Sequence, residues 1–312
     1  MSGLLQTRAG QLGLRAACAG LRAVFRHAPG RGGKQWLWDH VVRPHILWRT
    51  FPITADTRFG ARLEGGFPDV VHSFVYFFGV WEPSVTALYR AALRPGDVVI
   101  DIGANVGLHT LLAAHLVGPS GRVHAIEASP WICARLRRNL AANGANQVVV
   151  HNMAATAEPG PVQVYLHDPS NLGGTTILAS EAVLHGAAPE AMVDGRPLGD
   201  IVPMADIEAA RLIKIDVEGA EWLVAQGMAG LLPRLRPDCE ILVEARASAL
   251  TALGGSTEAF IGLFTAAGFI PFELRNSYAG AEYIGEAAPA TLLATHDFEQ
   301  ADLLFRRGPD GG

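Results

Sequence analysis

The sequence predicts an α/β fold in which helices cover both faces of a doubly wound, mostly parallel sheet of seven strands. Short apolar runs, of the kind that strands buried on both faces show, recur along the chain. Longer segments with apolar residues at helical spacing alternate with these runs. Of the 312 residues, 49% are hydrophobic, which is enough for one large core.

Residues 98–116 form the clearest strand, turn and helix of the predicted sheet. The strand carries Asp101, the glycine-rich residues 103–107 turn the chain, and leucines follow at helical spacing (Leu108, Leu111, Leu112 and Leu116). Free N–H groups at such a helix start, together with the missing Cβ atoms, are typical of a nucleotide or anion site. A dinucleotide fingerprint would need glycine where the chain has Asn105 and Leu108.

The next two strands end in residues that suit a nucleoside. Residues 122–127 predict a strand that ends at Glu127, whose carboxylate is able to accept hydrogen bonds from both ribose hydroxyls. A helix over residues 130–143 follows. Residues 148–153 predict the third strand, and Asn152 and Met153 at its end are expected beside the base of that nucleoside.

The remaining chain continues the alternation of strands and helices. Residues 51–80 are expected to form short strands and turns, and residues 180–200 an irregular surface segment. Six or more strands alternating with helices indicate a doubly wound sheet rather than a barrel of eight repeats. The further predicted strands are residues 162–166, 212–216, 239–244, 268–274 and 302–305, and the further predicted helices are residues 83–93, 221–227 and 257–267.

Three polar residues are candidates for substrate contact. His167 and Asn171 lie in the polar, glycine-rich residues 167–176, which are expected to close over a substrate. His109 follows the central turn, where it either contacts substrate or packs within the first helix.

The first 50 residues differ in charge from the rest and are expected to form an arm on a domain of residues 51–308. They hold seven arginines and one lysine against a single acid, Asp39. Residues 1–28 predict an amphipathic helix that lies on an anionic membrane or packs on the domain that follows. The remaining alternative is a frayed arm. The tryptophans that follow, Trp36, Trp38 and Trp48, are expected to pack against the domain.

Composition narrows the class of protein and its compartment. The formal net charge of −5 gives no reason to expect a nucleic-acid partner. The three cysteines are widely spaced and suggest neither a disulfide framework nor a metal cluster, which fits a reducing compartment. We therefore expect a cytoplasmic protein, peripheral at the membrane if the arm binds lipid. Nothing in the sequence indicates an oligomeric state.

Two segments resemble one family. Residues 98–110 and residues 213–221 (Ile-Lys-Ile-Asp-Val-Glu-Gly-Ala-Glu) resemble the two signatures of the FkbM family of S-adenosylmethionine-dependent methyltransferases. Residues 79–83 and 302–305 are similar to that family too, although the link between residues 203 and 213 is shorter than usual. The resemblance implies a class I, Rossmann-like methyltransferase fold with a final antiparallel strand. It also implies methyl transfer from S-adenosyl-L-methionine to a hydroxyl of a sugar, glycan, lipid-linked or polyketide-like acceptor.

The resemblance also assigns roles to the cofactor residues. Glu127, with Ala128 next to it, would bind the ribose, and Asn152 and Met153 would flank the adenine. Asp101 would bond the turn or a cofactor-bound water, and the alternative is a carboxylate that only braces the turn backbone. The methionine end of the cofactor would lie against Asp101, Gly103, Ala104, Asn105 and Gly107.

The catalytic base is expected at the end of the fourth strand. Asp216 is the first candidate and Glu218 the second, although Glu218 is also suited to capping the helix that follows. Glu221 is expected in a salt bridge. No third ligand accompanies the two acids, so no metal is predicted. A nicotinamide-dependent oxidoreductase and a non-catalytic cofactor-binding module are the alternatives.

Overall fold

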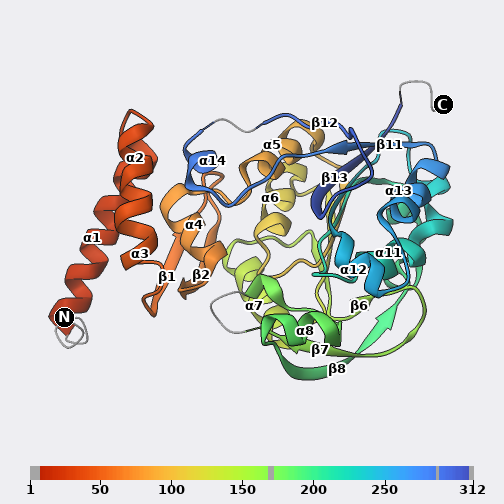
Figure 1. Ribbon diagram of the computed structural model, residues 1–312, viewed down its shortest axis with the longest axis horizontal. Helices are drawn as coiled ribbons and strands as arrows, with labels where there is room; N and C mark the ends of the chain where they lie inside the picture. The colour runs from red at the N-terminus through yellow and green to blue at the C-terminus, as the bar shows by residue number, and fades with distance from the viewer. Residues whose placement is uncertain (1–7, 168–171, 286–287, 309–312) are drawn as a thin grey trace. The chain divides into compact units, whose positions relative to one another are not determined.

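The computed structural model describes residues 8–167, 172–285 and 288–308, and the chain divides into two compact units (Figure 1). Met1–Pro83 and Ser277–Ala287 form the first unit, and Ser84–Asn276 and Ala288–Gly312 form the second. The structure therefore groups residues 51–83 with the basic N-terminal segment. Within the described residues, no helix combines the length and apolar character that crossing a bilayer requires.

The first unit packs helices on a two-stranded hairpin around an aromatic core. The Phe25 ring contacts the rings of Trp38 and Phe78, with centroids 5.9 and 5.1 Å apart. The strands β1 and β2 pair in antiparallel fashion. The elements of this unit are α1 (Arg8–His27), α2 (Gly32–Leu37), a π-helical turn (Trp38–Val42), α3 (Arg43–His45), β1 (Phe51–Asp56), β2 (Arg62–Phe67), α4 (Val70–Phe78) and α14 (Gly280–Ile284).

Helix α1 is amphipathic, as predicted, and its apolar face packs within the first unit. Cys18 and Phe25 on that face are buried. The guanidinium of Arg26 donates to the carbonyl oxygens of Asp56, Val75 and Tyr76 at 2.7–2.9 Å, which fixes the end of α1 to the hairpin and to α4. This packing contradicts the alternative of a frayed arm for residues 8–27, and contact of the helix with a membrane stays a prediction.

Helix α4 replaces part of the strands and turns expected over residues 51–80. Its β-branched and aromatic residues favour strands in isolation. The carboxylate of Asp69 caps the helix by accepting from the His72 N–H at 2.9 Å, and Gly79 ends it in the left-handed conformation. Since most of its side chains are buried, tertiary packing overrides the local strand preference.

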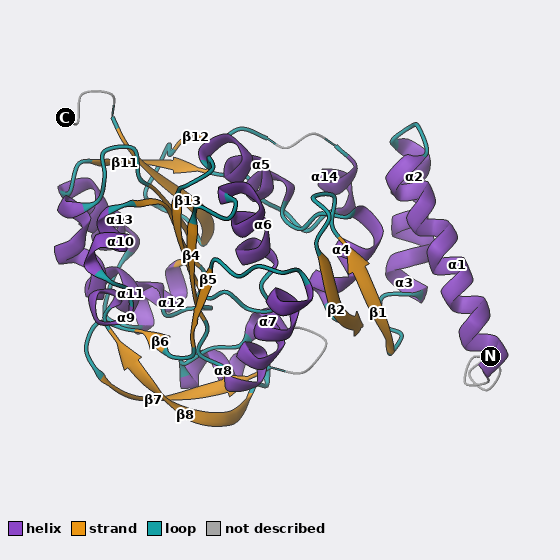
Figure 2. Ribbon diagram, turned by 180° about the vertical axis from the view of Figure 1, so that it is seen from behind, coloured by secondary structure: helices purple, strands orange, loops and turns teal. Residues whose placement is uncertain are grey.

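The second unit is a doubly wound α/β fold, as predicted. Its large sheet has the strand order β12-β11-β13-β10-β9-β3-β4-β5, in which β13 runs antiparallel to β10 and β11. Figure 2 shows α6 and α7 on one face of this sheet and α10, α11 and α13 on the other. The seven predicted strands are present, and an edge strand of two residues, β12, makes the eighth.

The observed boundaries agree closely with the predicted ones for the buried elements. The strands of the large sheet are β3 (Val98–Ile102), β4 (Arg122–Ile126), β5 (Val148–His151), β9 (Ala210–Ile215), β10 (Glu240–Arg246), β11 (Phe269–Glu273), β12 (Thr291–Leu292) and β13 (Gln300–Arg307). The helices are α5 (Pro83–Ala92), α6 (Leu108–Val117), α7 (Pro130–Ala142), α9 (Leu198–Ile201), α10 (Met204–Glu208), α11 (Glu221–Met228), α12 (Ala247–Ala252) and α13 (Thr257–Ala266), with 3₁₀ turns at Leu172–Gly174 and Ala229–Arg234.

A second, three-stranded sheet corrects the prediction of an irregular segment over residues 180–200. This segment forms α8 (Ala179–His185) and β8 (Ala188–Arg196). Strand β8 pairs antiparallel with β7 (Gly160–Leu166) and parallel with β6 (Ala154–Ala155). Residues 188–196 have little apolar alternation, so their strand depends on the partner β7 rather than on local sequence.

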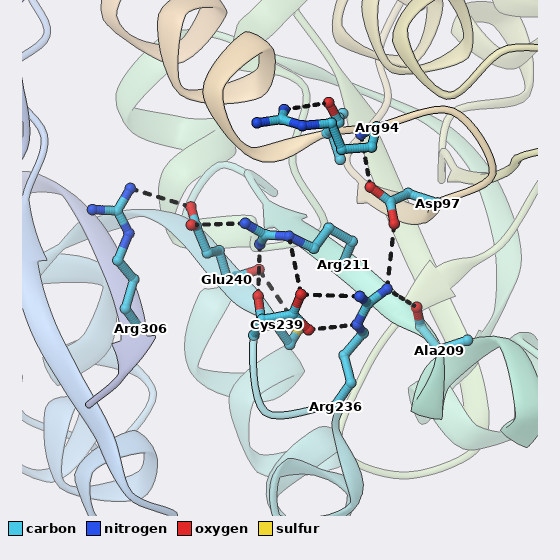
Figure 3. A network of polar contacts seen from close by, with 10 residues as sticks. Arg94, Asp97, Ala209, Arg211, Arg236, Cys239, Glu240 and Arg306 are labelled. Carbon is cyan, nitrogen blue, oxygen red and sulfur yellow. Dashed lines mark hydrogen bonds and ion pairs between the residues drawn. The ribbon is translucent and has the colours of Figure 1, made fainter. Parts of the chain in front are cut away.

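Charged side chains connect the large sheet at the amino ends of its parallel strands (Figure 3). Glu240 of β10 accepts from Arg211 of β9 at 3.2 Å and from Arg306 of β13 at 3.3 Å. Arg236 pairs with Asp97, which precedes β3, at 3.3 Å. These ion pairs lie at the edge of the sheet opposite the carboxyl ends of the parallel strands. They therefore leave the carboxyl-end edge available for a ligand.

The strand order reverses between β3 and β9, which are adjacent although far apart in the chain. Ligands of doubly wound sheets bind at the carboxyl ends of strands beside such a reversal. The predicted site residues follow β3, β4, β5 and β9, so they meet at this edge.

Candidate active site

The turn after β3 lies against the end of β9. Gly103 has φ +84°, and a Cβ there would lie 1.7 Å from the carbonyl oxygen of Asp216. The Asp216 N–H donates to the Ile102 oxygen at 3.0 Å. Glycine is therefore required at 103 both for the backbone conformation and for the close approach of the two strand ends.

The N–H groups of this turn are used within the protein, contrary to the expectation that free donors wait for a ligand. Gly103 and Ala104 both donate to the Ile126 oxygen, and Gly107 donates to the Ala104 oxygen. Asn105, at φ +50°, donates to Glu127, and its own side-chain oxygen accepts from the Val106 N–H. The N–H groups of the turn are thus already bonded to acceptors within the protein.

Asp101 is buried on the face of the sheet that α6 covers. Thr110 of α6 donates to Asp101 Oδ2 at 2.5 Å. Oδ1 is also buried and has no hydrogen-bond partner among the described residues. Burial raises the pKa of Asp101, against the opposing effects of Lys214 and the Thr110 bond. A buried acceptor without a donor is costly, so Oδ1 is suited to a donor from a bound molecule.

Glu127 connects the ends of β3 and β4. Its Oε2 accepts from the Asn105 N–H and its Oε1 from the Ser129 N–H, both at 2.9 Å. Burial raises the pKa of this carboxyl to about 7, although both hydrogen bonds oppose the rise. Each oxygen retains a second lone pair, so the carboxylate is able to hold the turn and accept ribose hydroxyls together.

Asn152 and Met153 follow β5, as predicted. The side-chain amide of Asn152 donates to the main-chain oxygens of Glu127, at 2.9 Å, and of Ala128, at 3.0 Å. Asn152 therefore braces the loop after β4. Met153 is partly buried and packs against the main core. The structure therefore shows a bracing role for Asn152, and its place beside adenine stays a prediction.

The end of β9 carries a buried ion pair. Lys214 Nζ donates to Asp216 Oδ2 at 2.7 Å, and the lysine side chain is only 5% exposed. Asp101 is the register partner of Lys214 on β3. The ammonium therefore holds Asp216 in position, and its charge also opposes the rise in the pKa of Asp101.

Glu218 and Glu221 occupy the turn between β9 and α11. Glu218 has φ +52°, a strained conformation for a residue with a side chain. Burial, followed by the charges of Asp216 and Glu221, raises the pKa of Glu218 well above its usual range. Glu221 is not a salt-bridge residue as expected, because its Oε1 accepts from the Val217 and Gly219 N–H groups.

The three candidates for substrate contact differ in their burial and surroundings. His109 is buried with its ring 5.6 Å from that of Tyr89. Burial and the Lys214 ammonium lower the pKa of His109 well below its usual range, so the neutral ring fits the packing alternative. His167 is half-buried just after β7, and Asn171 lies outside the described residues.

The chemistry of this edge fits a cationic ligand. Burial is the main cause that raises the pKa values of Asp101, Glu127 and Glu218, and repulsion from neighbouring acids adds to each rise. The Lys214 ammonium opposes the rise at Asp101 and at Glu218. A sulfonium or an ammonium group is attracted to such a set of carboxylates, whereas a pyrophosphate is repelled. Within the described part of the chain, no three His, Cys, Asp or Glu side chains are grouped to hold a metal ion.

Residues 101–271, which contain the turn, Glu127, Asp216 and Glu218, match the model of the Methyltransferase FkbM domain. The chain belongs to the FkbM methyltransferase family. S-adenosyl-L-methionine is the cofactor of this methyltransferase domain.

Relatives match only part of the chain. The 31-O-demethyl-FK506 methyltransferase FkbM of Streptomyces tacrolimicus is 30% identical over 180 residues, covering 46% of this chain and 64% of that protein. A protein-L-isoaspartate O-methyltransferase of Ignicoccus hospitalis is 45% identical over 60 residues, covering 19% and 28%. The chain thus spans less than two thirds of these relatives. The solved methyltransferase FkbM from Methylobacillus flagellatus is 15% identical, with TM-score 0.38, over 76% of this chain and 54% of that one.

Sequence reasoning missed two polar residues near Asp216. Lys214 was counted only as part of an apolar strand, although a lysine in such a run is itself a signal of a buried ion pair. Asp302 lies on β13, where burial raises its pKa to about 7, with a further contribution from Asp216. The sequence placed Asp302 in a strand, but its proximity to Asp216 depends on sheet order.

The titration of Glu127 predicts a pH-dependent affinity for the cofactor product. If Glu127 binds the ribose as the sequence predicts, ribose hydroxyls would donate to the charged carboxylate, and binding would favour its deprotonated form. With the pKa of Glu127 at about 7, affinity for S-adenosylhomocysteine is expected to rise about tenfold from pH 6 to pH 8 and then level off. Calorimetry at several pH values measures this, and Glu127→Gln is expected to flatten the profile. An unchanged profile in the glutamine variant contradicts the assignment.

Proposed function

We propose that this protein transfers methyl from S-adenosyl-L-methionine to a hydroxyl of a sugar, glycan, lipid-linked or polyketide-like acceptor. The observation that carries the proposal is the pair of carboxylates, Asp216 and Glu218, that follows β9 at the reversal of strand order. A hydroxyl is a poor nucleophile, and a positioned carboxylate is able to remove its proton. The name of the Streptomyces tacrolimicus relative, a 31-O-demethyl-FK506 methyltransferase, supports methylation of oxygen.

Within this proposal, Glu218 is the general base and Asp216 positions it electrostatically. A base works best when its pKa lies near the working pH, and the raised pKa of Glu218 moves it in that direction. Asp216 is paired with Lys214 and contributes to that rise. The sequence alone favoured Asp216, because the charges around the two acids depend on the folded turn.

Bound S-adenosyl-L-methionine supplies an activated methyl group on a sulfonium. Asp101 and Glu127 would orient it at the ends of β3 and β4, and the turn of residues 103–107 would limit its movement. Glu218 would accept the proton from the acceptor hydroxyl as that oxygen attacks. Thr176 donates to the Glu218 main-chain oxygen at 2.8 Å, so the backbone of the Glu218 turn is held by a residue from the segment after β7. Within the proposal, His167 in that segment would contact the acceptor.

Methyl transfer from labelled cofactor to fractionated metabolite and cell-envelope extracts tests the proposal. Label is expected in a product that resists mild alkali, because a methyl ether is stable under conditions that hydrolyse a methyl ester. Label that alkali releases as methanol would instead indicate a carboxyl acceptor and contradict methylation of a hydroxyl. Protein without cofactor, and extract without protein, serve as the controls.

A further inference from the structure

An exposed stripe runs along residues 32–48 of the first unit, which are helical up to His45 and form a turn over residues 46–48. Its members recur every four residues and are all exposed: Trp36, His40, Pro44 and Trp48. A buried stripe recurs at the same interval, two residues later: Trp38, Val42 and Ile46. Two residues correspond to about 200° around a helix, so the exposed stripe faces away from the core of the unit.

The π-helical turn Trp38–Val42 keeps this stripe straight. On an α-helix, a four-residue interval drifts by about 40° at each step. The longer i→i+5 hydrogen bonds of a π turn add residues to the turn and offset that drift. The segment from α2 to α3 therefore presents one continuous face along its length, beside α1 (Figure 1).

The two tryptophans of this face are unusually exposed. Trp36 is 57% exposed and Trp48 is 68% exposed, although the sequence predicts that both pack against the domain. The Trp36 ring stacks on the His40 ring with centroids 5.1 Å apart, so its orientation is fixed from within the stripe. An indole combines a large apolar surface with one N–H donor, a combination that suits the interface between a bilayer and water.

The charges next to the stripe are positive. Arg43 precedes Pro44 and Arg49 follows Trp48, and both arginines are exposed. Asp39 is the only acid among the first 50 residues. Arginines beside interfacial tryptophans complement the phosphates of anionic lipids.

We infer that Trp36, His40, Pro44, Trp48, Arg43 and Arg49 form a docking surface for an anionic phospholipid bilayer. This surface differs from the one expected from the sequence, since the apolar face of α1 packs within the first unit. The tryptophans enter the headgroup region and the arginines bind lipid phosphates.

Sedimentation of the full chain with vesicles tests the docking surface. The wild type is expected to bind phosphatidylcholine vesicles that contain phosphatidylglycerol, and to bind pure phosphatidylcholine and high-salt samples far more weakly. Trp36→Ala with Trp48→Ala is expected to lower binding at least about tenfold, since two large apolar contacts are lost. Arg43→Gln and Arg49→Gln are each expected to lower it about fivefold.

Matched control variants distinguish binding through this surface from nonspecific binding of the protein to vesicles. Trp131→Ala removes another exposed tryptophan, which stacks with Arg135, from the second unit. Arg15→Gln removes an exposed charge from α1. Both are expected to bind vesicles as the wild type does, and all variants to unfold at the same temperature. The inference would be overturned if a control variant lost as much binding, or if the double tryptophan variant bound vesicles fully. It would also be overturned if the stripe formed a dimer interface and the protein did not bind vesicles.

Discussion

Glu218→Gln is expected to lower the rate of methyl transfer by about 10²–10⁴ while leaving the affinity for S-adenosylhomocysteine within about twofold. Glutamine keeps the shape of the side chain but is unable to accept a proton. Single-turnover transfer at saturating cofactor, with calorimetry on the same samples, measures both quantities. Retention of more than about a tenth of the wild-type rate would reject Glu218 as the base.

Asp216→Asn distinguishes the two acids through the pH profile. Asp216 raises the pKa of Glu218, so removing its charge is expected to lower that pKa. A base must be deprotonated to act, and the rate therefore rises with pH through its pKa. The acid limb of the profile is expected to move to lower pH in Asp216→Asn. If Asp216 is itself the base, activity is expected to fall at every pH, without a shift of the acid limb to lower pH.

Gly103→Ala is expected to destabilise the second unit by about 4 kcal/mol or more. The new Cβ would meet the Asp216 oxygen at 1.7 Å, and the backbone at φ +84° disfavours any side chain. Relief of the clash would separate the ends of β3 and β9, so binding of S-adenosylhomocysteine is expected to be lost as well. Equilibrium unfolding in urea measures the stability.

Gly254→Ala is the matched control for that substitution. Gly254 has φ +80°, but a Cβ there would have no atom within 4 Å. Only the backbone strain remains, so a loss of about 1–2 kcal/mol is expected. Equal losses at positions 103 and 254 would show that the close approach of the two strand ends contributes nothing.

The buried sheet was predictable because its signals are local. Strands such as β3 and β9 are apolar runs that must be buried on both faces, and glycine marks the turn between β3 and α6. Helix α4 and strand β8 were not predictable in the same way. Helix α4 depends on its N-terminal cap and on the surrounding core, and strand β8 depends on pairing with β7.

The site was predictable as positions but not as interactions. Strand ends followed by Asp101, Glu127 or Asp216 could be located from the pattern of apolar residues. The pairing of Lys214 with Asp216 is local to the end of β9 but depends on how the two side chains are oriented there. The approach of Asp302 to Asp216 depends on strand order, which brings distant segments together. The use of the turn's own N–H groups depends on Ile126 and Glu127 of the neighbouring strand.

The central claim is that the carboxyl ends of β3, β4 and β9 bind S-adenosyl-L-methionine and not a dinucleotide. Calorimetric titration of the full chain with S-adenosylhomocysteine and with NAD, in the same buffer at about pH 8 so that Glu127 is charged, tests it most directly. One bound S-adenosylhomocysteine per chain and no heat from NAD is the predicted result. Binding of NAD, or a failure of S-adenosylhomocysteine to bind folded protein, would contradict it.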